Sequence, residues 1–169
     1  LTDVTGVQTC ALPISLIVAG ETGFGKTSWL NAAQTRVNGP VRRVTLRRRV
    51  LREDDFLAFL ARELELELDA SETRSTVIDA IAKAERQAIL VDDVHLLTLR
   101  GVGALGAWDA FTEIVERTRH NTLWVAAMNG FAFQHLAWAR GGVEPFREKV
   151  HLRSWRSEEH TSELQSRQS

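Results

Sequence analysis

A short glycine-rich segment near the start of the chain constrains the fold more than any other feature. The segment GETGFGKT, at Gly20–Thr27, matches the pattern G-x-x-x-x-G-K-[ST]. It follows the apolar run SLIVA at 15–19, and the residues from Lys26 to Val37 favour a helix that ends at the Asn38–Pro40 turn. A strand, a glycine-rich loop and a helix in this order predict a phosphate site, because unpaired N–H groups at a helix N-terminus attract anions.

The pattern also assigns roles to individual residues. Backbone N–H groups from Gly23 to Ser28 are expected to converge on the β-phosphate of a nucleotide. The Lys26 ammonium would lie on the β- and γ-phosphates and assist catalysis, and the Thr27 hydroxyl would complete the coordination of Mg²⁺. The predicted nucleotide-binding residues are Gly20, Glu21, Thr22, Gly23, Phe24, Gly25, Lys26, Thr27 and Ser28.

A second motif, AILVDDVH at 88–95, supplies the acidic partner that such a loop needs. Asp92, at the end of an apolar strand, would hold Mg²⁺ through a bound water. Asp93 is placed to polarise the attacking water as a general base, and the alternative is that it caps the following turn. His95 is interpreted as a surface or packing residue rather than a catalyst.

A third strand, in TLWVAAMNG at 122–130, ends in a polar residue. Ligands of open α/β sheets bind at the carboxyl ends of the strands, so Asn129 is a candidate catalytic residue that positions the lytic water or contacts the γ-phosphate. The alternative is a simple turn asparagine before Gly130.

Apolar runs and helical spacing alternate along the rest of the chain. Further strands are predicted at 41–46, 87–91, 122–128 and 149–152. Helices are predicted after a cap at Asp54 or Asp55, and at about 73–86, 107–119 and 131–138. This order predicts a three-layer α/β fold, with about five mostly parallel strands and helices on both faces.

The two ends of the chain are expected to be artefacts. RSEEHTSELQS at 156–166 translates an oligonucleotide whose reverse complement translates as VTGVQTCALPIS at 4–15. The string resembles a common sequencing-library adapter. We therefore expect 1–15 and 156–169 to be adapter-derived, with a truncated domain at 16–155 from environmental or metagenomic sequence.

Composition limits the function classes. The chain has 21 basic and 22 acidic residues, so its charge does not support nucleic acid or a membrane surface as partner. The basic run from Arg42 to Arg52 is interpreted as a solvated edge, and the tryptophans as core residues. No apolar stretch predicts a membrane-spanning helix in this piece. The only cysteine, Cys10, lies in the expected adapter segment.

The loop, the acidic pair and the polar strand end together resemble the AAA+ superfamily of P-loop ATPases and the related multidomain signalling (STAND) ATPases. In this resemblance GETGFGKT is Walker A, ILVDDVH is Walker B and Asn129 is sensor 1. The resemblance implies a P-loop NTPase core that uses ATP and Mg²⁺, with homo-oligomers or partner domains and a cytoplasmic location. It also implies a helical lid after Trp155, which we expect to be missing, and an arginine acting in trans. Arg147 is near that place, and Arg140 competes for the role.

Two function hypotheses follow. The first is an ATPase that couples ATP binding and hydrolysis to conformational change in other domains or partners, with little activity expected of the isolated piece. The alternative is a nucleotide-gated binding module, initiator-like or a signalling switch, that hydrolyses little because Asp93 stands where Glu is more frequent in the family. A third hypothesis, a small-molecule kinase, lacks a candidate acceptor residue and a phosphate-clamping lid.

Overall fold

Five parallel strands form one sheet in the described part of the chain. The computed structural model describes residues 15–68, 72–98, 105–141 and 143–153. The strand order across the sheet is β2-β3-β4-β1-β5, and every neighbouring pair is parallel. The strands are β1 (Leu16–Gly20), β2 (Val41–Thr45), β3 (Gln87–Asp92), β4 (Thr122–Asn129) and β5 (Glu148–Leu152).

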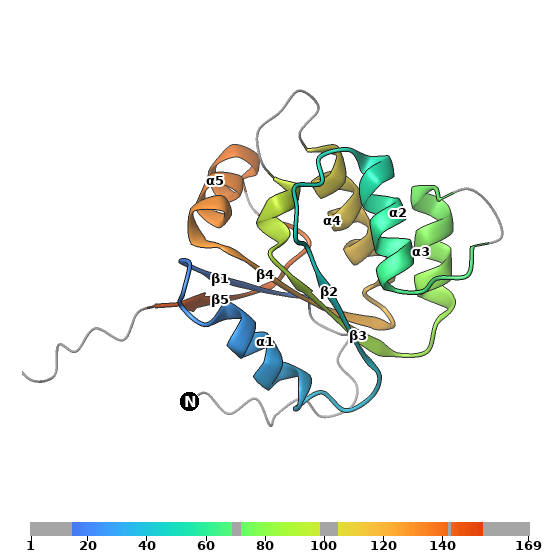
Figure 1. Ribbon diagram of the computed structural model, residues 1–169, viewed down its shortest axis with the longest axis horizontal. Helices are drawn as coiled ribbons and strands as arrows, with labels where there is room; N and C mark the ends of the chain where they lie inside the picture. The colour runs from blue at the N-terminus through green and yellow to red at the C-terminus, as the bar shows by residue number, and fades with distance from the viewer. Residues whose placement is uncertain (1–14, 69–71, 99–104, 142, 154–169) are drawn as a thin grey trace, which may run out of the picture.

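Helices cover both faces of this sheet, which makes three layers (Figure 1). Helix α1 lies on one face, and α2 to α5 lie on the other. The helices are α1 (Lys26–Gln34), α2 (Glu53–Glu63), α3 (Arg74–Lys83), the 3₁₀ helix η1 (Val94–Leu97), α4 (Gly106–Thr118) and α5 (Gly130–Arg140). The predicted α/β class and layer arrangement are confirmed.

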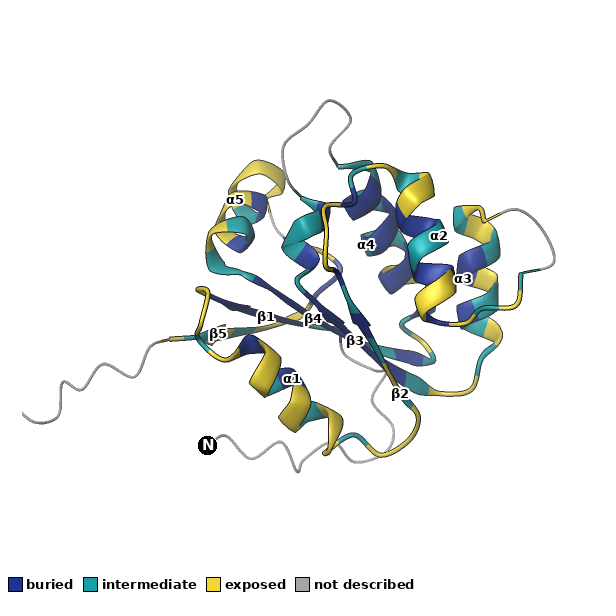
Figure 2. Cartoon of the chain, viewed as in Figure 1, coloured by how far each residue is buried: buried dark blue, intermediate teal, exposed yellow. Residues whose placement is uncertain are grey.

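The core is unequal on the two faces, as the burial colouring of Figure 2 shows. On the face of α2 to α5, Phe111 of α4 packs against Phe56, Trp108, Trp124 and Phe146 with ring centroids about 6 Å apart. The α1 face buries a smaller set: Val18, Leu30, Leu90, Val125 and Ala127. Burial of apolar surface by α2 to α4 therefore supplies most of the hydrophobic stabilisation.

The strand order brings the sequence motifs together. Parallel strands end at the same edge of a sheet, and β1 lies directly beside β4, with Gly20 opposite Asn129. Strand β3 is the next neighbour of β4, so the acidic pair lies at that edge too. Residues far apart in the sequence thus form one site.

Several expectations need correction. Helix α2 begins at Glu53 after Arg52 as N-cap, so Asp54 and Asp55 lie inside its first turn instead of capping it. The Trp138 side chain on α5 is 84% exposed and is not a core residue. The expected adapter segments fall almost wholly outside the described residues. No helix in the described part of the chain has both the length and the apolar character needed to cross a membrane.

Candidate nucleotide-binding site

The glycine-rich loop has a backbone that few other residues would allow. Gly23 and Gly25 have φ values of +86° and +78°, in the left-handed region that side chains disfavour. A Cβ at either position would meet no atom within 4 Å, so the conformation requires glycine for its dihedral angles and not for space. Helix α1 begins at Lys26, directly after Gly25, and this leaves the N–H groups of its first turn facing the loop.

The first glycine of the loop is required for a different reason. A Cβ on Gly20 would lie 3.1 Å from the Leu152 Cβ and 3.2 Å from the Leu152 carbonyl oxygen. The end of β1 therefore contacts the end of β5 with no side chain between them. On the other side, a Cβ on Gly130 at the start of α5 would lie 3.6 Å from the Gly20 carbonyl carbon.

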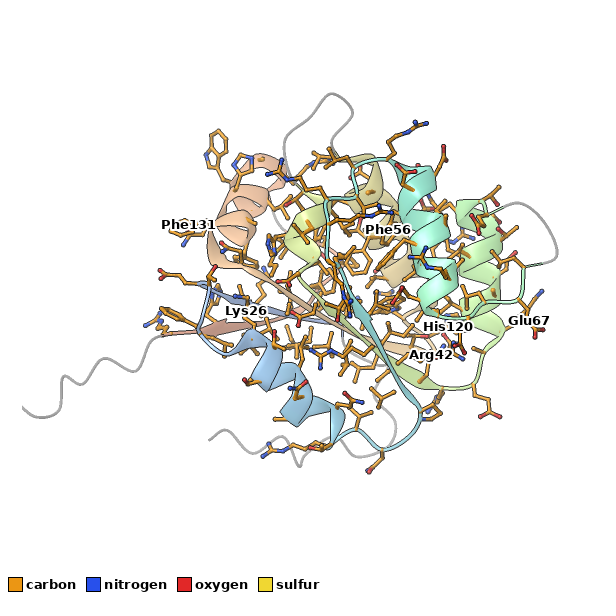
Figure 3. The ribbon with its side chains drawn as sticks, viewed as in Figure 1. Lys26, Arg42, Phe56, Glu67, His120 and Phe131 are labelled. Carbon is orange, nitrogen blue, oxygen red and sulfur yellow. The ribbon has the colours of Figure 1, made fainter. Side chains whose placement is uncertain are left out.

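Lys26 is buried at the mouth of the loop, at the start of α1 (Figure 3). Its Nζ donates hydrogen bonds to the Gly20 carbonyl oxygen at 3.0 Å and the Glu21 carbonyl oxygen at 2.8 Å. These bonds hold the ammonium within the loop.

Thr27 and Asp92 meet across the sheet edge. The Thr27 hydroxyl donates to Asp92 Oδ2 at 2.8 Å, and the Asp93 backbone N–H donates to Asp92 Oδ1 at 3.0 Å. Asp92 is only 2% exposed. A hydroxyl and a carboxylate beside a phosphate-binding loop are the hard oxygen donors that Mg²⁺ prefers, so these residues fit the implied metal.

Arg43 is a site residue that the sequence interpretation missed. Its Nη2 lies 3.1 Å from Asp92 Oδ2, and its Nη1 donates to Asn31 Oδ1 on α1. The basic run was interpreted as a solvated edge, which describes the exposed Arg47, Arg48 and Arg49 but not Arg43. The alternation of β2 carried a signal, because Arg43 and Thr45 share one face and Thr45 pairs with Asp92 in register.

Asp93 is the N-cap of η1, in a left-handed conformation with φ +59°, and its side chain makes no cap hydrogen bond. Its Oδ1 lies 3.8 Å from His95 Nδ1. Burial lowers the pKa of His95, the Lys26 charge lowers it further, and the Asp93 and Asp92 carboxylates partly oppose this. The buried His95 Nδ1 has no hydrogen-bond partner among the described residues, so His95 packs against the site with one ring nitrogen unsatisfied.

Asn129 caps α5 and also contacts the loop. Its Oδ1 accepts a hydrogen bond from the Phe131 backbone N–H at 2.8 Å, which makes it a helix cap and not a simple turn residue. Its Nδ2 lies 3.4 Å from the Thr22 hydroxyl oxygen of the loop. Asn129 therefore links the end of β4 to the glycine-rich loop.

A groove of about 800 Å³ adjoins the start of the loop. Its walls come from the loop, from the first turns of α5 and from the end of β5, and they include Glu21, Phe24, Phe131 and His151. The Phe131 side chain is 70% exposed at the start of α5 (Figure 3).

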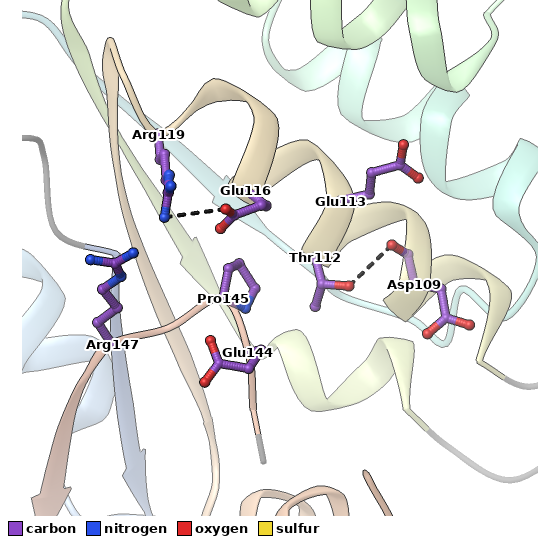
Figure 4. Close-up of a pocket in the computed structure, with 8 residues that line it drawn as sticks. All are labelled: Asp109, Thr112, Glu113, Glu116, Arg119, Glu144, Pro145 and Arg147. Atoms are coloured by element: carbon purple, nitrogen blue, oxygen red, sulfur yellow. Dashed lines mark hydrogen bonds and ion pairs between the residues drawn. The ribbon is translucent and has the colours of Figure 1, made fainter. Parts of the chain in front are cut away.

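The two candidate trans-acting arginines lie away from this loop. Arg147 precedes β5, and its backbone N–H donates to the carbonyl oxygen of Ser15, which precedes β1, at 3.1 Å. Arg147 therefore lies at the end of the sheet where the strands begin, and the loop lies where β1 ends. It lines a cavity of about 370 Å³ beside α4 with Glu116, Arg119 and Glu144 (Figure 4). Arg140, at the end of α5, forms an ion pair with Asp109 at 3.1 Å. Neither arginine lies where it would reach the loop of its own chain.

Comparison with known proteins agrees with this geometry. The model of a family described as "AAA domain" matches residues 13–134. No curated protein matches the chain. Among solved structures, the Aeropyrum pernix Orc1 protein in complex with DNA is similar, with a TM-score of 0.59 and 16% sequence identity. The match covers 85% of this chain and 40% of the Orc1 chain, so this chain spans well under half of the length of that relative. Because the family model matches most of its length and the fold agrees, this chain belongs to the AAA domain family of nucleotide-binding ATPase modules.

Proposed function

We propose that this chain is the nucleotide-binding and hydrolysing core of an AAA+ ATPase that uses ATP with Mg²⁺. The observation that carries the proposal is the 2.8 Å hydrogen bond from Thr27 to Asp92, which joins the phosphate loop to the acidic strand end. The predicted Walker A and Walker B residues therefore lie in contact, beside a buried lysine. This arrangement is typical of phosphoryl-transfer sites.

The residues of the candidate site have separate parts in the proposed reaction. The α1 N–H groups and the Lys26 ammonium would bind the phosphates, and Thr27 with Asp92 would hold the divalent cation, whose charge would stabilise developing negative charge. Asp93 accepts a proton from the attacking water as general base. The Asn129 amide orients that water, and its contact with Thr22 keeps it against the loop.

The proposal extends to assembly and coupling. Arg147 lies where β1 and β5 begin, and the loop of its own chain lies where β1 ends. We therefore propose that Arg147 acts on the nucleotide of a neighbouring subunit. ATP turnover would drive conformational change in other domains or partners, as in the multidomain signalling ATPases.

A second candidate is a nucleotide-gated binding module with little hydrolysis. The observation that favours it is the placement of Asp93, a short carboxylate in a left-handed turn whose Oδ1 lies 3.8 Å from His95 Nδ1. The similar Orc1 protein was solved in complex with DNA. In this second candidate function, the nucleotide state of this chain would likewise control the binding of a partner.

A pair of substitutions tests the proposal. Lys26→Ala should lower nucleotide affinity by at least about 100-fold, measured by titration with a fluorescent ATP analogue, because it removes the phosphate-binding charge. Asp93→Ala should leave affinity within about threefold, and the corresponding substitution in an intact homologue that carries the helical lid should lower turnover by at least about 100-fold, measured by phosphate release. Arg36→Ala, an exposed residue just after α1, is the matched control and should change neither.

The outcomes separate the two candidates. Unchanged affinity in Lys26→Ala would show that the loop is not the nucleotide site. Unchanged turnover in Asp93→Ala would show that Asp93 is not the general base. Because little activity is expected of the isolated piece, turnover is compared in an intact homologue that carries the helical lid. Tight binding without turnover by that homologue would favour the nucleotide-gated module.

A further inference from the structure

Arg43 lies where the β2 strand meets both α1 and the acidic strand end. Side chains alternate along β2, so Val44 packs in the core of the α2–α5 face and Arg42 donates to the Leu64 carbonyl oxygen after α2. Arg43 points to the other face. There one end of its guanidinium contacts Asn31 of α1, and the other end contacts Asp92 of β3.

Asp92 is a buried anion with few acceptor positions left. Oδ2 accepts from the Thr27 hydroxyl at 2.8 Å and from Arg43 Nη2 at 3.1 Å, and Oδ1 accepts from the Asp93 N–H at 3.0 Å. Lys26 is occupied by the loop carbonyls instead. Arg43 is therefore the cation that compensates the Asp92 charge among the described residues, since a buried carboxylate without a partner is costly.

We propose that the positive charge of Arg43 weakens magnesium binding at Asp92. The inference rests on the proposed function of the same site. Arg43 and Mg²⁺ are both cations that share one carboxylate, so each lowers the affinity of Asp92 for the other. Asn31 fixes the guanidinium from the far side, and this keeps its charge at Asp92 rather than in solvent.

The electrostatic effect of Arg43 on Asp92 can be distinguished from an effect on the orientation of the Asp92 carboxylate. Without Arg43, the hydrogen bonds from Thr27 and from the Asp93 N–H still hold both carboxylate oxygens. Removing the guanidinium therefore removes the competing positive charge and leaves the carboxylate in place. A residue that served only to orient Asp92 would have the opposite effect, because its loss would weaken magnesium binding.

The test compares nucleotide affinity with and without magnesium. A fluorescent ATP analogue is titrated into the full chain in excess Mg²⁺ and in EDTA. The dissociation constant in EDTA divided by that in Mg²⁺ gives the factor by which magnesium strengthens nucleotide binding. Arg43→Gln and Arg43→Met should each raise this ratio by about tenfold, because a neighbouring positive charge is lost. Arg43→Lys keeps the charge and should stay within about threefold of the unsubstituted chain. Arg42→Gln, on the same strand but the opposite face, is the matched control and should leave the ratio unchanged.

Each other outcome counts against the inference. A ratio that is unchanged or lower in both neutral variants overturns it while the proposed function stands. If neither neutral variant gives a cooperative thermal transition, Arg43 is a structural requirement of the fold and the inference is wrong. If the unsubstituted chain binds nucleotide in neither condition, the proposed function itself fails, and the role of Arg43 fails with it.

Discussion

The two faces of the sheet differ in what they contribute. The face covered by α2 to α5 carries the aromatic cluster around Phe111 and most of the buried apolar side chains. Among the described residues, the α1 face buries a cluster of five apolar side chains, and the outer surface of α1 is exposed (Figure 2). Yet Thr27, Asn31, Arg43 and Asp92 meet on the α1 side, where β2 and β3 approach that helix.

This difference indicates a division of labour between stability and chemistry. A thick apolar layer tolerates little polar rearrangement, since every buried polar group there needs a partner. The thin layer under α1 instead holds the hydrogen-bonded polar side chains of the candidate site. Substitutions on the two faces should therefore separate unfolding free energy from nucleotide affinity.

The largest expected effect is on the thick face. Phe111→Ala should lower the free energy of unfolding by about 3 to 5 kcal/mol, because Phe111 is fully buried among four other rings. Nucleotide affinity of the molecules that remain folded should not change. Urea unfolding and nucleotide titration of the same sample measure both. A loss of affinity larger than the unfolded fraction explains would contradict the proposal that the α2–α5 face contributes stability but not nucleotide binding.

A smaller stability effect with a binding effect is expected on the thin face. Leu30 is the fully buried apolar side chain of α1, and Leu30→Ala should cost about 2 to 3 kcal/mol in unfolding free energy. It should also lower nucleotide affinity, because α1 carries the N–H groups that bind phosphate. Ile78→Ala on α3 is the matched aliphatic control and should lower stability alone. Equal nucleotide affinities in Leu30→Ala and Ile78→Ala would contradict the proposal that the α1 face contributes to nucleotide binding and the α2–α5 face does not.

A polar link inside the thick face should show a smaller cost. The Trp124 indole N–H donates to the Thr118 hydroxyl at 2.9 Å, and this hydroxyl donates to the Ile114 carbonyl oxygen at 2.7 Å. Thr118→Ala leaves the buried indole N–H without a partner and should cost about 1 to 2 kcal/mol. Thr118→Ser keeps the hydroxyl and should recover most of that loss in chemical denaturation. Equal losses in both variants would assign the effect to the missing methyl group instead.

The smallest expected effect is a pH dependence at the site. Burial lowers the pKa of His95 below its ordinary value of 6.5, so the folded state binds fewer protons at this residue than the unfolded state. Stability contributed here is complete at higher pH and falls as the pH drops through and below about 6.5. His95→Asn should flatten the fall in thermal midpoint between about pH 7 and pH 5. His120→Asn, an exposed residue after α4, is the control, and an equal change there would contradict this assignment.

The sequence predicted the fold well because its strongest signals are local. Continuous apolar runs such as Ile89–Val91 mark buried parallel strands, and the GETGFGKT pattern marks the strand-to-helix loop. Parallel topology then brings Asp92 and Asn129 to the loop without further information. The nucleotide and metal roles of all the site residues, including Lys26, Thr27 and Asp92 as well as Asp93, Asn129 and Arg147, stay predictions, because they depend on how these groups meet a ligand.

Features that depend on tertiary contacts were harder to predict. Arg43 lies in a run of basic residues, and only its pairing with Asp92 and Asn31 distinguishes it from the exposed Arg47. For Arg43, the partner on a neighbouring element decides its surroundings, and a single sequence does not show that partner. Trp138 is different, because it lies two residues after Leu136 and five after Phe133, spacings that place it on the other side of α5 from these buried side chains.

The close approach of Gly20 to Leu152 has a mechanical consequence. The end of β5 rests directly on backbone at the first residue of the phosphate loop, and Gly130 at the start of α5 lies close to the same point. A flexible side chain at this joint would absorb small displacements, but two backbones in contact transmit them. A side chain at Gly20 would therefore push the end of β5 away from the loop. The position of the loop relative to β5 thus depends on the absence of a side chain at this one residue.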